Sequence, residues 1–125
     1  MIRWVFAFLL TSGGAIACDM SGLRMGSEDG NAPSVFVSVD KIPLAKPFVI
    51  HLTVCTDTEI TGLDLDAIMP VHQHGMNYRP TIAATGAGSY RVEGMLFHMP
   101  GHWELQVKFG QKGRSLTYTL PMNVK

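Results

Sequence analysis

Apolar and polar side chains alternate without exception in the stretch Trp103-Glu104-Leu105-Gln106-Val107-Lys108-Phe109. Successive side chains of a β-strand point to opposite faces, so this period of two predicts a strand with one dry and one wet face. Residues 48–55 and 63–69 follow the same alternation. From Ser34 onward no window of ten or more residues shows a helical period, which predicts an all-β fold.

Four further segments complete a set of seven predicted strands. Turn-forming residues separate the segments, most clearly in residues 41–46, 86–88 and 110–113. The predicted strands are residues 35–39, 48–55, 63–69, 79–84, 90–96, 103–109 and 116–124. Seven short antiparallel strands in about 90 residues predict a single immunoglobulin-like antiparallel β-sandwich.

The first seventeen residues have the pattern of an export signal peptide. Arg3 supplies the positive end, residues 4–10 the apolar centre, and Ala15-Ile16-Ala17 the small-residue cleavage site. The apolar centre is too short to cross a bilayer as a helix, so we expect no transmembrane helix in the mature chain. These features predict a periplasmic protein.

Cys18, the first residue after the predicted cleavage site, has two alternative fates. A cysteine at this position resembles a bacterial lipobox, and a lipid on its thiol would anchor the protein to a membrane as a lipoprotein. An exported protein could instead pair Cys18 with Cys55, the only other cysteine of the chain. Residues 18–33 are rich in Gly, Ser and Asp without periodicity and predict a flexible tether in front of a domain of residues 34–125.

Histidine and methionine gather in two segments between predicted strands. These segments are Met69-Pro70-Val71-His72-Gln73-His74-Gly75-Met76 and His98-Met99-Pro100-Gly101-His102. In a sandwich whose strands run alternately up and down, the loops after the third and fifth strands lie at the same end. We therefore expect the two segments to converge, and we expect Cys55 to lie at the opposite end.

These donors favour copper over other metals. Thioether sulfur is a soft ligand that selects Cu(I), whereas imidazole binds both Cu(I) and Cu(II). Neither segment contains a carboxylate or a thiol, which disfavours Ca²⁺, Mg²⁺, structural zinc and iron–sulfur clusters. We therefore predict a copper site. Its predicted ligands are His72, His74, Met76 and His98, with Met69, Met99 and His102 in reserve.

Each of these residues also has a plain structural interpretation. The loop histidines could be ordinary polar residues with satisfied hydrogen bonds, and Met69 could be core packing. His102 is out of phase with Trp103 and could point into solvent. In that case the His/Met end would serve as a metal-free protein-interaction or assembly module of the cell envelope, with methionines supplying adaptable apolar contacts.

Composition and motifs argue against two other classes of function. Ten Lys and Arg residues balance ten Asp and Glu residues and form no basic run, so the sequence predicts no binding of nucleic acid. The chain has no nucleophile in the setting of a Ser/His/Asp triad and no glycine-rich phosphate loop. We therefore predict that the protein is not an enzyme.

The His/Met segments and their flanks resemble the YtkA-like/FixH-like domains of exported and membrane-anchored bacterial proteins. The resemblance covers about residues 34–124 and is carried by Met69-Pro70-x-His72-x-His74-Gly75-Met76, Gly88-x-Tyr90, Gly94-Met95-x-Phe97 and Met99-Pro100-Gly101-x-Trp103-Glu104-Leu105. It implies an immunoglobulin-like sandwich that handles copper or delivers it, as a chaperone, to a respiratory oxidase under assembly or to another cuproenzyme. The chain departs from FixH in having no predicted transmembrane helix after cleavage, which argues against a role inside a membrane complex.

Overall fold

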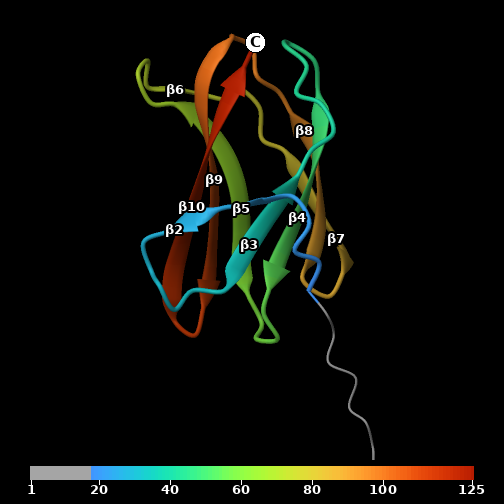
Figure 1. Cartoon of the computed structure of the whole chain (residues 1–125), viewed down its shortest axis with the longest axis vertical. Helices are drawn as coiled ribbons and strands as arrows, with labels where there is room; N and C mark the ends of the chain where they lie inside the picture. Colours follow the sequence, from blue (N-terminus) through green and yellow to red (C-terminus); the bar gives the residue numbers. More distant parts are fainter. Residues whose placement is uncertain (1–17) are drawn as a thin grey trace, which may run out of the picture.

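A computed structural model describes residues 18–125, so the predicted signal peptide lies outside the described residues. Residues 18–125 form two five-stranded antiparallel sheets packed face to face (Figure 1). No helix occurs among these residues, and hence none that could span a membrane. The predicted all-β sandwich is confirmed.

Ten strands make up the two sheets. They are β1 (Leu23–Arg24), β2 (Gly26–Ser27), β3 (Ser34–Ser38), β4 (Phe48–Cys55), β5 (Thr61–Met69), β6 (His74–Gly75), β7 (Thr81–Gly86), β8 (Ser89–Met95), β9 (Gly101–Gln111) and β10 (Arg114–Val124). One sheet has the order β1-β3-β4-β8-β7, and the other has the order β2-β10-β9-β5-β6. The seven longer strands thus divide into four and three, in the order of an immunoglobulin constant-type sandwich.

The seven predicted strands are all present, with bounds that shift by a few residues. The start of β7 moves inward by two residues, from residue 79 to Thr81. Pro80 directly precedes it and has no N–H to give to a strand ladder, so pairing starts only after the proline. The three strands that the sequence did not predict, β1, β2 and β6, have two residues each. A two-residue strand is too short to show a period.

The alternating residues of β9 form the centre of the core. Trp103, Leu105 and Val107 are fully buried between the sheets. The Trp103 ring lies 4.8 Å from the Phe97 ring, measured between centroids, and its Nε1 donates a hydrogen bond to the Met99 carbonyl at 2.9 Å. Trp103 therefore fixes the loop that precedes β9 as well as filling the core.

Residues 18–33 are not the flexible tether that the sequence predicted. β1 pairs with β3 and β2 pairs with β10, so this segment passes from one sheet to the other (Figure 1). Met25, between the two strands, is buried, and its N–H donates to the Val35 carbonyl at 2.9 Å. The segment belongs to the sandwich because these backbone pairs and one buried side chain hold it. The Gly/Ser-rich composition of the segment did not predict these contacts.

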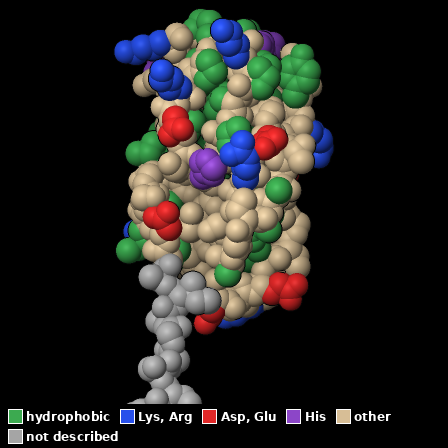
Figure 2. All heavy atoms as spheres, turned by 90° about the vertical axis from the view of Figure 1, so that its right-hand side faces the viewer, with side chains coloured by type: hydrophobic (Ala, Val, Ile, Leu, Met, Phe, Trp, Pro, Cys, Tyr) green, Lys and Arg blue, Asp and Glu red, His purple; other side chains and the backbone are tan. Residues whose placement is uncertain are grey.

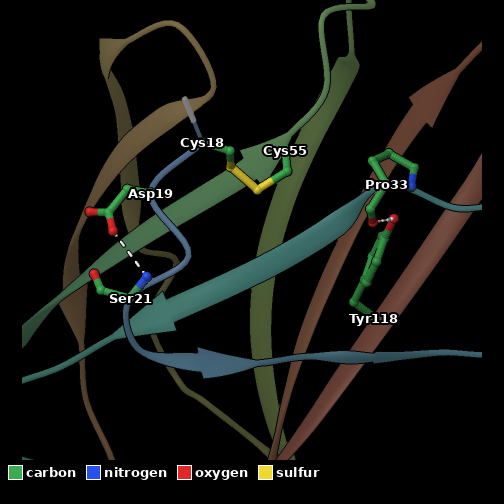
Figure 3. Close-up of a disulfide and its surroundings, with 6 residues drawn as sticks. All are labelled: Cys18, Asp19, Ser21, Pro33, Cys55 and Tyr118. Atoms are coloured by element: carbon green, nitrogen blue, oxygen red, sulfur yellow. Dashed lines mark hydrogen bonds between the residues drawn. A yellow bond between two sulfur atoms is a disulfide. The ribbon is translucent and has the colours of Figure 1, made fainter. Parts of the chain in front are cut away.

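A disulfide joins Cys18 to Cys55 at the end of β4 (Figure 3). The two Cα atoms are 5.5 Å apart, within the usual range for a bridge. The sequence allowed either this bridge or a lipid anchor at Cys18. A bonded Cys18 sulfur has no free valence for a lipid, so the structure contains the disulfide alternative and not the lipoprotein one.

Tyr118 makes a second tie to the N-terminal segment. Its hydroxyl donates a hydrogen bond to the Pro33 carbonyl at 2.6 Å (Figure 3), and its ring stacks on Phe109 with centroids 5.3 Å apart. Burial, together with the nearby Asp29 carboxylate, raises the pKa of Tyr118 to about 12. The hydroxyl therefore stays protonated at neutral pH and remains a hydrogen-bond donor.

Replacing Trp103 with alanine should lower the free energy of unfolding by about 3–5 kcal/mol, because it empties the centre of the core. Urea denaturation measures the change. Lys108→Ala is the control, since Lys108 is exposed on the same strand, and it should stay within about 0.5 kcal/mol of the wild type. A Trp103→Ala variant as stable as the wild type would contradict the central role of this side chain.

Reducing the disulfide should destabilise the native chain by about 4 kcal/mol, because the bridge closes a loop of 37 residues in the unfolded state. Thermal unfolding with and without reductant measures the effect, and Cys18→Ser/Cys55→Ser should reproduce it. Reductant should leave that double variant unchanged. If the unreduced wild type reacts with a thiol label in denaturant, or if its mass includes a lipid, the bridge is absent.

Candidate metal site at the upper end of the sandwich

The two His/Met segments lie at the same end of the sandwich. The loops 39–47, 70–73, 76–80 and 96–100 form this end, here called the upper end because it is uppermost in Figure 1. Cys55 ends β4 at the opposite, lower end. The strand order places both segments at this end, as the sequence predicted.

His72 and His74 are exposed on the tight hairpin that joins β5 to β6. The His72 N–H donates to the Met69 carbonyl at 3.2 Å, and Gln73 turns the chain back with a φ of 53°, which is uncommon for a residue other than glycine. The two imidazole centroids are 6.2 Å apart. Because a metal bonded at 2.0–2.1 Å lies about 3 Å from the ring centre, two imidazoles on one ion have centres at most about 6 Å apart. Both rings would therefore bind one ion only with their donor nitrogens turned toward each other, and thioethers on the same ion would require the ring centres to come closer together than 6.2 Å.

Met69 connects the two segments. It is buried and pairs with His74 across the hairpin, so the two side chains project from the same face of the sheet, the inner one. A Cβ atom added to Gly101, whose φ is 129°, would lie only 2.9 Å from the Met69 Cε. The Met69 thioether thus ends against the start of β9. Met76 and Met99 are partly buried and pack against the same core.

His98 is half-buried beside Trp103. The two rings meet edge to face, with centroids 5.5 Å apart and planes at 80°. The Nδ1 atom of His98 is buried and has no hydrogen-bond partner in the described part of the chain. A buried polar atom without a partner costs free energy, so in a native structure a water molecule or an ion would satisfy it.

His102, predicted as a reserve ligand, lies outside this arrangement. It is exposed and pairs with Asn123 in β10, on the face of the sheet opposite to that of Trp103. The alternation along β9 therefore directs its imidazole away from the interior donors. The phase of His102 relative to Trp103 already allowed this outcome.

The other three predicted histidines do not form one cluster. Across residues 18–125, no three His, Cys, Asp or Glu side chains lie close enough together to hold a metal ion. The nitrogen donors instead divide into the exposed pair, His72 and His74, and the half-buried His98. A metal site here would have to combine imidazoles with thioethers, which are the donors that Cu(I) accepts.

Sequence patterns did not reveal the exposed apolar side chains at this end. Val71 is 81% exposed, Tyr78 59% and Leu44 41%. Their only sequence signal is that they fall in turn-rich segments and outside the alternating strands. Exposure depends on how a loop packs, which composition does not specify.

A broad open hollow of about 1190 Å³ lies at the lower end, around the disulfide. Its lining includes Cys18, Cys55, Asp57 and Glu59 but no histidine. It is therefore separate from the His/Met donors and does not contribute to the candidate metal site.

Comparison with known proteins assigns no family, since no protein-family model, no curated protein and no solved structure matches the chain. The resemblance to YtkA-like/FixH-like domains stays a prediction from the motif residues. The candidate site accordingly stands on its own geometry.

Replacing His98 with phenylalanine should leave the free energy of unfolding unchanged or raise it by on the order of 1 kcal/mol, because the change removes an unpartnered buried atom and keeps an aromatic edge against Trp103. Chemical denaturation of the metal-free protein measures it. His51→Phe, at an exposed position in β4, is the matched control. A loss above about 1 kcal/mol would mean that the Nδ1 atom has a stabilising partner, such as a bound water.

Proposed function

We propose that this protein binds one copper ion at its upper end, prefers Cu(I) to Cu(II), and carries copper in the periplasm to a respiratory or other cuproenzyme. The observation that supports this most directly is the exposed pair His72 and His74, with ring centres 6.2 Å apart on the hairpin that also positions Met69. Copper is cargo in this proposal and takes part in no reaction.

The donor set favours the reduced ion. Cu(I) is soft and binds thioethers well, whereas Cu(II) gains little from sulfur of this kind. Met69 ends β5 and Met76 directly follows β6, so the two thioethers flank the hairpin that carries both imidazoles. The unpartnered Nδ1 of His98 would supply a further nitrogen from the second segment.

The exposure of the hairpin suits a carrier better than a permanent cofactor site. His72 and His74 are accessible from solvent, while the thioethers behind them are buried or half-buried. A partner could therefore approach the ion from outside without unfolding the sandwich. The motif resemblance and the predicted export signal support the same role, in copper delivery outside the cytoplasm.

Residues 18–125 should compete with a chromogenic chelator for about one equivalent of Cu(I) and should hold Cu(II) more weakly. His72→Ala/His74→Ala should lower the Cu(I) affinity by more than about a hundredfold. Loss of a residue that only hydrogen bonds to a metal ligand already lowers metal affinity by up to about that factor, and this variant removes two ligands. His51→Ala is the matched control, since this histidine is exposed on β4 away from the upper end. Its affinity should equal that of the wild type.

Folding should not require the ion. The buried residues of both sheets already form one core, unlike a zinc finger, which takes its folding energy from the metal. The metal-free protein should therefore unfold cooperatively, and copper at a hundredfold excess over its dissociation constant should add about 2.7 kcal/mol. Micromolar or weaker Cu(I) binding that the double variant does not change would refute the copper proposal and favour the metal-free interaction module.

A further inference from the structure

Exposed apolar side chains concentrate at the upper end. Five large apolar residues are exposed within residues 18–125, and three of them, Leu44, Val71 and Tyr78, belong to upper-end loops. Leu44 lies between β3 and β4, Val71 between β5 and β6, and Tyr78 between β6 and β7. Three separate loops thus each present one apolar side chain to solvent.

The same end is basic. Lys41 and Lys46 flank Leu44 in their loop, and Arg79 follows Tyr78, whereas Asp40 is the one carboxylate in the four upper-end loops. In Figure 2 the charged side chains nearest the top of the molecule are Lys and Arg, which stand among hydrophobic ones, and the Asp and Glu side chains lie lower, together with further Lys and Arg side chains. The upper-end loops therefore carry an excess of positive charge.

The lower end carries the opposite charge. Its connecting segments hold five carboxylates and the ammonium group of Lys112, and the guanidinium of Arg114, the first residue of β10, pairs with one of these carboxylates, Asp29, at 2.7 Å, which leaves an excess of negative charge. The carboxylates are Asp19, Glu28, Asp29, Asp57 and Glu59. An anionic surface would therefore attract the upper end and repel the lower one.

Two of the three apolar loop residues, Leu44 and Val71, lie in loops that are held in place. The Ala45 N–H donates to the Phe97 carbonyl at 2.8 Å, and Leu44 forms a bridge with the same fully buried residue, so core contacts fix this loop. Val71 lies inside the turn closed by the hydrogen bond from His72 to Met69. Because these loops are already ordered, burying their side chains in a partner would cost little conformational entropy.

We propose that the upper end docks onto a bilayer that contains anionic phospholipids. Leu44, Val71 and Tyr78 would enter the interfacial region, where aliphatic and tyrosine side chains are favoured. Lys41, Lys46 and Arg79 would meet the lipid phosphates.

A bilayer fits this surface better than a protein partner does. Stable protein interfaces bury about 800 Å² on each side around a central apolar cluster, whereas here the apolar side chains stand on three separate loops, two of which also carry cations. Docking does not depend on copper. It would hold the His72–His74 hairpin at the membrane surface.

Vesicle sedimentation tests the proposal with residues 18–125, which contain both sheets and both cysteines but lack the apolar N-terminal stretch. Without copper and at low salt, the protein should pellet with phosphatidylcholine vesicles that contain phosphatidylglycerol, but not with phosphatidylcholine alone. The partition coefficient should fall by about fivefold for each charge removed in Lys41→Gln/Lys46→Gln, and it should fall with added salt. Lys108→Gln, on the exposed face of β9, should bind like the wild type.

A second pair of variants tests insertion of the apolar side chains. Val71→Ser should weaken binding, whereas Leu23→Ser, at an exposed position in β1, should not. The fluorescence of Tyr78→Trp should move to shorter wavelength on anionic vesicles. Absence of pelleting, equal binding by the upper-end variants and their controls, or unshifted emission would each overturn membrane docking. Because the measurements use metal-free protein, they leave the copper proposal untouched.

Discussion

The packing of Trp103, near the start of β9, is the interaction on which the upper end depends. Its ring contacts Phe97 and His98, and its Nε1 hydrogen bonds to the Met99 carbonyl. One core side chain therefore positions the whole loop that carries the second group of donors. A large fully buried side chain has little freedom to move, so this loop inherits the rigidity of the core.

The first group of donors depends on the same core through Met69. This buried residue pairs with His74 in the hairpin and lies against Gly101 at the start of β9. Glycine at that position leaves room for the Met69 methyl group, which a Cβ atom there would approach to 2.9 Å and displace. Packing inside the sandwich thus sets the separation between the two His/Met segments.

The two ends of the sandwich differ in how they are closed. At the lower end the disulfide joins the N-terminal segment to β4, and the Tyr118–Pro33 hydrogen bond holds the same segment further along the sandwich. At the upper end, loops display imidazoles, cations and apolar side chains to solvent. Stabilising ties that lie away from the exposed loops leave those loops free to bind without loss of the fold. This division is consistent with a carrier that meets other surfaces at one end only.

The alternation of apolar and polar residues determined the seven long strands, and their order along the chain determined that the His/Met segments share one end. The phase of Trp103 likewise predicted that it is core and allowed His102 to face outward. Tertiary structure alone decided that Cys18 reaches Cys55, that residues 23–27 pair with both sheets, and that the Nδ1 of His98 is left without a partner. These features depend on contacts between residues far apart in the chain. A local periodic pattern records which face a side chain occupies, but it carries no information about what lies opposite that face.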